Sequence, residues 1–123
     1  MSRPDDSAWA AAEAVRELNH QTLVHDSRDS FEWPSDVDAV IAALETLAQR
    51  LPQAINQASR WLVTAVDAGR VGHDEGRDAA GAVDEACEHL SGSADLATHL
   101  SYRLGLARAQ TSHLTGRATG AQR

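Results

Sequence analysis

Two long stretches of the chain repeat apolar or small residues in alternating steps of three and four, and this spacing constrains the fold more than any other feature. It is the heptad pattern of a helix that packs along one seam, and it does not fit the period of a β-strand. Only the glycine-containing run from Gly69 to Arg77 separates the two stretches, so the sequence predicts an antiparallel helical hairpin. The predicted seam of the first stretch is Val37, Ile41, Leu44, Ala48, Leu51, Ile55, Ala58, Leu62, Ala65 and Gly69, and that of the second is Ala79, Val83, Ala86, Leu90, Ser93, Ala97, Leu100, Leu104, Ala107, Thr111 and Leu114.

Capping residues and a proline refine this prediction. Ser35 and Asp78 are expected to cap the two hairpin helices, and Gly69 can supply the left-handed residue that ends the first one. Pro52 removes a backbone donor, but the seam keeps its phase across it, which predicts one helix kinked at that residue. The fold class is therefore all-α: a long antiparallel hairpin with a shorter N-terminal helix, forming a three-helix bundle that can dimerise. The predicted ranges are about 7–23, 36–68 and 78–114 for the helices, 1–114 for the single domain and 115–123 for a disordered tail.

The charge of the chain restricts its partners. A net charge of −7 at pH 7 and a pI near 5.2 disfavour nucleic acid, whose binding needs a cationic patch, and favour a basic protein or none. The one cysteine, Cys87, cannot form an internal disulfide, which is consistent with a reducing compartment. The start of the chain does not resemble a signal peptide, and no stretch approaches the roughly 20 apolar residues of a membrane span. We therefore expect a soluble cytoplasmic protein.

The first hairpin helix has an apolar stripe beside its seam that one partner helix cannot cover. The stripe contains Val40, Leu47, Ala54, Trp61 and Ala68, seven residues apart. We expect the first four of these residues to bind a partner, either a second copy of the chain or another protein, with Trp61 as the anchor. In the alternative interpretation the N-terminal helix covers the stripe together with Phe31 and Trp33. The second hairpin helix carries small residues on one flank, which allow a close approach of the two helices: Ala80, Cys87, Ala94 and Ser101.

Candidate chemistry is sparse. His89, His99 and His113 are separated by ten and fourteen residues, too far along one helix to share a metal ion. Glu85 and Glu88 form an E-x-x-E turn, with Asp84 and Asp95 nearby, of the kind found in magnesium-dependent all-α nucleotide pyrophosphohydrolases. The middle of the facing helix offers no second acidic cluster, since it carries Gln53, Asn56, Gln57 and Arg60. We therefore expect no catalysis, no metal and no cofactor, and we keep a pyrophosphohydrolase-like enzyme as the alternative. A small apolar ligand bound between the helices is a further alternative.

Several short segments resemble one group of proteins. They are ELNHQT at 17–22, LPQAINQASRWL at 51–62, AGRV at 68–71 and HLTG at 113–116. In overall pattern the chain resembles short all-helical hypothetical proteins of streptomycetes and related actinobacteria, which implies a shared helical fold and adds nothing about catalysis. It differs from the WXG-type secreted hairpins, because residues 67–72 lack their Trp-x-Gly turn. The function predicted is that of a non-catalytic interaction protein or of a regulatory accessory whose acidic helices meet a basic partner.

Overall fold

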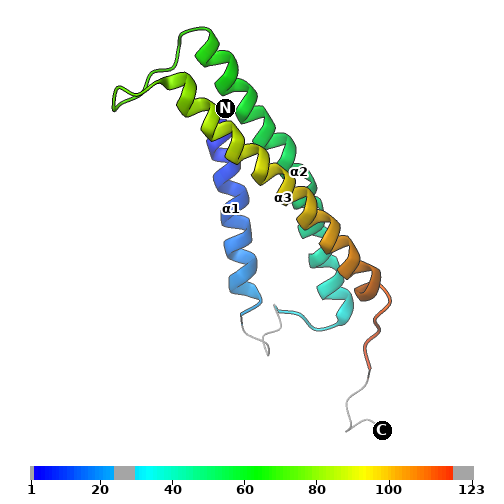
Figure 1. Cartoon of the computed structure of the whole chain (residues 1–123). Coiled ribbons are helices and arrows are strands. Elements are labelled where there is room, and N and C mark those ends of the chain that lie inside the picture. The colour runs from blue at the N-terminus through cyan, green and yellow to red at the C-terminus, as the bar shows by residue number, and fades with distance from the viewer. Residues whose placement is uncertain (1, 24–29, 118–123) are drawn as a thin grey trace. The chain divides into compact units, whose positions relative to one another are not determined.

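The computed structural model describes residues 2–23 and 30–117 and contains three helices in these ranges (Figure 1). They are α1 (Pro4–Gln21), α2 (Pro34–Asp67) and α3 (Ala79–Thr111), and the described residues form no strand. The predicted all-α class and the long hairpin are confirmed. The chain divides into two compact units, one of residues 1–37 with 114–123 and the other of residues 38–113, here called the hairpin. The single domain predicted over 1–114 stays a prediction.

The first unit contains α1. The helix begins at Pro4 rather than at Ser7, because proline fits the first helical position, where no amide donor is needed. Asp6 is the third residue of the helix, and its carboxylate accepts a hydrogen bond of 3.0 Å from the amide of Arg3, the residue before Pro4. No residue of α1 is buried. The predicted tail over 115–123 falls partly on residues 118–123, and these residues and 24–29 lie outside the described residues.

The start of α2 also differs from the prediction. The helix begins at Pro34, and the cap is the carboxylate of Asp36, which accepts the amides of Glu32 at 2.9 Å and of Trp33 at 2.8 Å. These two hydrogen bonds, that of Trp33 first, lower the pKa of Asp36 because they stabilise its charged form. The helix continues through Pro52 to Asp67, as predicted, while the kink at Pro52 stays a prediction.

The loop that joins the hairpin helices is built as the sequence predicts. Gly69 has a φ of 74° and ends α2 with two hydrogen bonds, from its own amide to the carbonyl of Val66 and from Arg70 to Ala65. Asp78 caps α3 by accepting the amides of Ala80 and Gly81, each at 3.2 Å. The helix α3 ends at Thr111 instead of Leu114.

The seam between α2 and α3 confirms one line of each predicted heptad, whereas the other line of α2 holds near the loop, where Ala65 is buried, and is corrected farther from it. Ala48, Val83 and Ala97 are buried on the predicted lines, but Ser93, Leu100 and Ala107 are exposed, as are Leu51 and Ala58. Their places in the seam are taken by the residues one position further along. On α2 this second line is Asp38, Glu45, Pro52 and Ser59, and on α3 it is Cys87, Ala94, Ser101 and Arg108.

The corrected line is explained by side-chain size. Ala94 is buried and the thiol of Cys87 lies 3.8 Å from the carbonyl of Ser59, so small residues bring the two backbones together. This confirms the expectation for the small flank at Cys87 and Ala94, whereas Ala80 is exposed. At this part of the seam the small residues lie between the helices, and Leu100 lies beside them.

The end of the hairpin farthest from the loop is held by polar groups. The guanidinium of Arg108 lies 3.4 Å from the carboxylate of Asp38 and 3.6 Å from that of Glu45, and the hydroxyl of Thr111 donates a hydrogen bond of 2.6 Å to Asp38. Only 19% and 21% of the two carboxylate side chains are exposed. These contacts run between the start of α2 and the end of α3, which fixes the two helices as antiparallel neighbours (Figure 1).

Candidate interaction surface

The predicted partner-binding residues lie on α2 beside the seam and do not enter it. Val40 and Leu47 are half-buried, Ala54 is exposed and the Trp61 side chain is 58% exposed. The Arg70 guanidinium lies 5.7 Å from the centre of the Trp61 ring, a cation–π distance. The Trp61 side chain nevertheless remains mostly exposed.

The seam determines which residues of α3 share a side of the hairpin with this stripe. Two antiparallel helices are related by a twofold axis that is perpendicular to the plane containing both helices. Residues at equivalent heptad positions of the two helices therefore lie on the same side of this plane. The polar contacts of Asp38, Glu45 and Arg108 occupy one flank of each seam. The opposite flanks therefore lie together, and they form what we call the apolar face: Leu44, Leu47, Leu51 and Trp61 of α2 with Leu96 and Leu100 of α3.

The other side of the hairpin has a different chemistry. Counted in the same heptads, it carries Gln49 and Asn56 on α2 and Ser91 and Thr98 on α3, all exposed. Val63 is its one large apolar residue on α2, with 42% of its surface exposed. The hairpin is thus amphipathic as a whole, with one mainly apolar and one mainly polar side.

The contribution of α3 to this surface was missed by the sequence analysis. Leu96 is 71% exposed and Leu100 is 47% exposed, and Tyr102 and Leu106 are also exposed on the outer side of the helix. Leu100 had been assigned to the seam, and Leu96 had been given no role. The sequence does contain a signal for this contribution, because α3 has more apolar residues from Leu96 onward than a single stripe can hold. The prediction of a second stripe covers only α2.

A shallow hollow lies on α3 next to the exposed Leu96. It is lined by Glu88, His89, Gly92, Ser93, Asp95 and Leu96. Gly92 leaves it open, because a Cβ atom added there would meet nothing within 4 Å. The hollow therefore joins an apolar side chain at the edge of the apolar face to two carboxylates.

The carboxylates considered for magnesium do not form a site across the hairpin. Asp84, Glu85, Glu88 and Asp95 are all exposed on α3. The facing stretch of α2 presents Gln53, Asn56 and Gln57, which are exposed and carry no charge. The structure therefore does not bring a second acidic cluster to the E-x-x-E turn.

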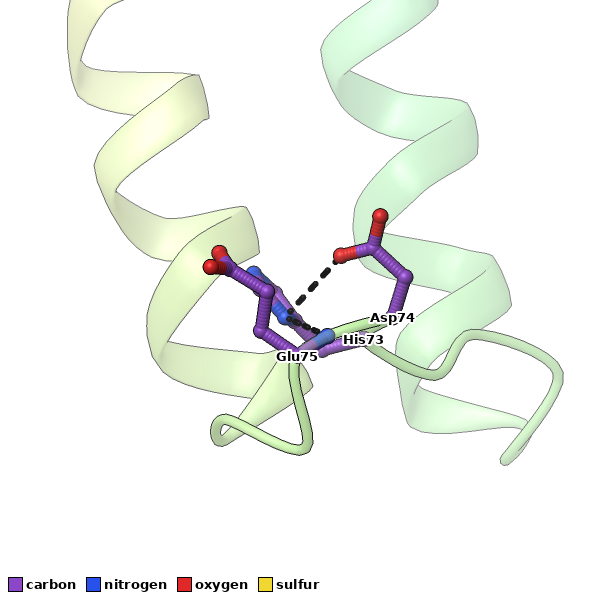
Figure 2. A group of neighbouring side chains, drawn as sticks. All are labelled: His73, Asp74 and Glu75. Carbon is purple, nitrogen blue, oxygen red and sulfur yellow. Dashed lines mark hydrogen bonds and ion pairs between the residues drawn. The ribbon is translucent and has the colours of Figure 1, made fainter.

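The hairpin loop contains a group of potential metal ligands that the sequence analysis did not single out. One ligand atom from each of His73, Asp74 and Glu75 lies within 4.8 Å of the others (Figure 2). The Nδ1 atom of His73 accepts the amide of Glu75 at 3.1 Å, and it lies 3.6 Å from Asp74 Oδ1. In this arrangement the lone pair of Nδ1 accepts the Glu75 amide and does not face a metal ion.

The remaining contacts of this group are those of a turn. The amide of Gly76, which has a φ of 73°, donates to the carbonyl of His73 at 3.1 Å. The Glu75 carboxylate lies 3.9 Å from the Arg77 guanidinium. These interactions stabilise the backbone between α2 and α3, so the geometry supports a structural role for the group.

No family model, no curated protein and no solved structure matches this chain. None of the described helices is long and apolar enough to cross a membrane.

Proposed function

We propose that the chain is a non-catalytic helical interaction protein that binds a second copy of itself or another protein through the apolar face. The observation that carries this proposal is the exposure of Trp61, Leu96 and Leu100 on one side of the hairpin. Contiguous apolar patches on monomeric proteins are small, and larger ones typically mark sites of association. Trp61 is the anchor of this account, because buried tryptophans dominate the binding energy of many interfaces.

The orientation of Trp61 supports the same function. The Arg70 guanidinium lies over one face of the ring, 5.7 Å from its centre, and the exposed remainder of the side chain can contact a partner. We place this association in the cytoplasm, on the grounds of the lone Cys87, which cannot form an internal disulfide.

Trp61→Ala tests the proposal, and Val63→Ala is its matched control. Both substitutions shorten an exposed side chain of the same helix, but Val63 lies on the mainly polar side of the hairpin. In sedimentation velocity of the full chain with its associated partner, Trp61→Ala should weaken the complex by about tenfold or more, as expected for a central tryptophan. Val63→Ala should leave it unchanged, and circular dichroism should show full helicity for both variants.

An equal effect of the two substitutions would contradict the proposal. So would a complex that survives Trp61→Ala with its stability intact.

A further inference from the structure

The carboxylates of the hairpin are absent from one of its sides. The structure describes every residue from 38 to 113, and in this range no aspartate or glutamate lies on the flanks of α2 and α3 that form the apolar face. Asp38 and Glu45 lie in the seam, where they pair with Arg108. The others lie elsewhere: Asp67, Asp84, Glu88 and Asp95 on the mainly polar side, Glu85 on the outer surface of α3, and Asp74, Glu75 and Asp78 in the loop.

This distribution bears on which partner can approach. The chain has a net charge of −7, so two copies repel each other wherever their acidic surfaces meet. On the side of the apolar face they can meet without placing carboxylates opposite each other. A basic partner, by contrast, would find no carboxylate to pair with there. The ionisable residues at the α3 edge of this side are His89 and Arg103, and the aliphatic stem of Arg103 can lie along a neighbouring helix while its guanidinium stays in water.

A second hairpin also matches this side in size. With 33 residues, α3 is about 50 Å long, and two packed helices are together about 20 Å wide. The side therefore offers roughly 1,000 Å² to a partner, whereas each partner in a stable complex buries roughly 800 Å². A single added helix is only about 10 Å wide, and it cannot cover both Trp61 on the outer edge of α2 and Leu96 on the outer edge of α3.

We propose that the occupant of the apolar face is a second copy of the chain, related to the first by a twofold axis, so that two hairpins form a four-helix bundle. This inference rests on the proposed function and names its partner. Twofold dimers use the same patch on both copies, and they are the commonest homo-oligomers. Each copy buries Trp61, Leu96 and Leu100 in this dimer, while the carboxylates of both copies stay outside it.

The experiment uses the purified full chain with no other protein. Sedimentation velocity from about 1 μM to about 100 μM should show a dimer of twice the 13.2 kDa chain mass, with a fraction that rises with concentration. Raising the salt concentration from about 50 mM to about 500 mM should not weaken this dimer. No carboxylate lies on the interacting side to form an ion pair across it, and salt screens the repulsion between the two acidic copies.

Two serines of α3 provide a matched pair of variants. Both are exposed, but Ser93 lies on the flank of the apolar face and Ser91 lies on the mainly polar side. Ser93→Glu places a carboxylate of each copy in the interface and should weaken the dimer by about tenfold or more. Ser91→Glu adds the same charge to the other side and should change the dissociation constant less than about twofold. Circular dichroism should show full helicity for both variants, because glutamate is a good helix former.

Three results would overturn the inference: a purified chain that stays at 13.2 kDa over the whole concentration range, a dimer that dissociates as the salt concentration rises, or equal weakening by the two serine variants. If the purified chain stays monomeric but forms a Trp61-dependent complex with a different protein, this inference fails and the proposed function stands. A dimer that Trp61→Ala does not weaken would contradict the proposed function as well. The two failures are therefore distinguishable.

Discussion

At the scale of single residues, Arg108 links the two ends of the chain segment that forms the hairpin. Its guanidinium lies within 3.6 Å of carboxylates at two positions of α2, and these two carboxylates hold the pKa of Arg108 above its ordinary value, with Asp38 as the larger cause. Asp38 and Glu45 lie on the same line of the seam. Without Arg108 they would be two largely buried negative charges with no cation between them.

Arg108→Ala should therefore lower the melting temperature of the hairpin more than Arg103→Ala, which removes an exposed arginine of the same helix that forms no ion pair with a described residue. Adding Asp38→Asn to Arg108→Ala should restore part of the loss, because one of the orphaned charges is then gone. Thermal unfolding followed by circular dichroism measures all three variants. Equal losses for the two arginine variants would show that the cluster does not hold the seam.

Asp36 and Asp38 give the stability of the chain a defined pH dependence. The pKa of Asp38 is lowered first by the hydrogen bond from Thr111 and then by Arg108, and that of Asp36 by the amides of Trp33 and Glu32. A carboxyl group with a lower pKa in the folded state stabilises the fold above its unfolded pKa, about 3.9 for aspartate. That stabilisation is lost as the pH falls through the folded pKa.

Urea unfolding at a series of pH values should therefore give a constant free energy of unfolding from about pH 7 to about pH 5, and a decrease below about pH 4. Asp38→Asn should flatten the decrease, since amides do not titrate. A wild-type curve that rises toward low pH, or an unchanged slope in Asp38→Asn, would contradict the assignment.

At the scale of elements, the glycines of the loop differ in their backbone conformation: Gly69 and Gly76 have a positive φ, and Gly72 does not. Gly69 ends α2 with a φ of 74°, a backbone region that costs a residue with a Cβ atom about 1 kcal/mol. Gly72 has no positive φ, and an added Cβ atom would meet nothing within 4 Å.

Gly69→Ala should destabilise the hairpin by about 1 kcal/mol, while Gly72→Ala should be neutral or stabilise it by about 0.5 kcal/mol through the lower entropy of its unfolded chain. Urea unfolding of the two variants at neutral pH distinguishes them. Equal stabilities would mean that α2 does not end in the left-handed turn at Gly69.

The elements also show how far the sequence determines the fold. The heptad spacing predicted the hairpin, and the glycine and aspartate residues of the loop predicted its ends, because these are local effects of period and backbone conformation. The spacing left two choices for the second line of each seam, since residues three or four positions from the first line both lie next to it. Tertiary packing made the choice, with small residues such as Ala94 between the helices and Leu51 and Leu100 outside.

The candidate surface follows from that choice. The stripe of Val40, Leu47, Ala54 and Trp61 could be predicted, because it lies outside either version of the seam. The contribution of Leu96 and Leu100 to this surface could not be predicted, because their exposure depends on which flank of α3 faces α2. Likewise the contacts of Arg108 depend on the register of the helices, which no local pattern determines.

At the scale of the whole molecule, the chain combines an acidic charge of −7 with an amphipathic hairpin. Negative charge keeps such a protein soluble while its apolar face is free, and it disfavours wrong partners of the same sign. The central claim is that this face is used for association and not for catalysis.

Native mass spectrometry of the full chain, prepared gently from its own cells, tests that claim most directly. We expect an assembly heavier than the 13.2 kDa chain for the wild type and for Val63→Ala, and its loss in Trp61→Ala. A wild-type chain found only at 13.2 kDa would contradict the account, and so would an assembly of the same mass in all three proteins.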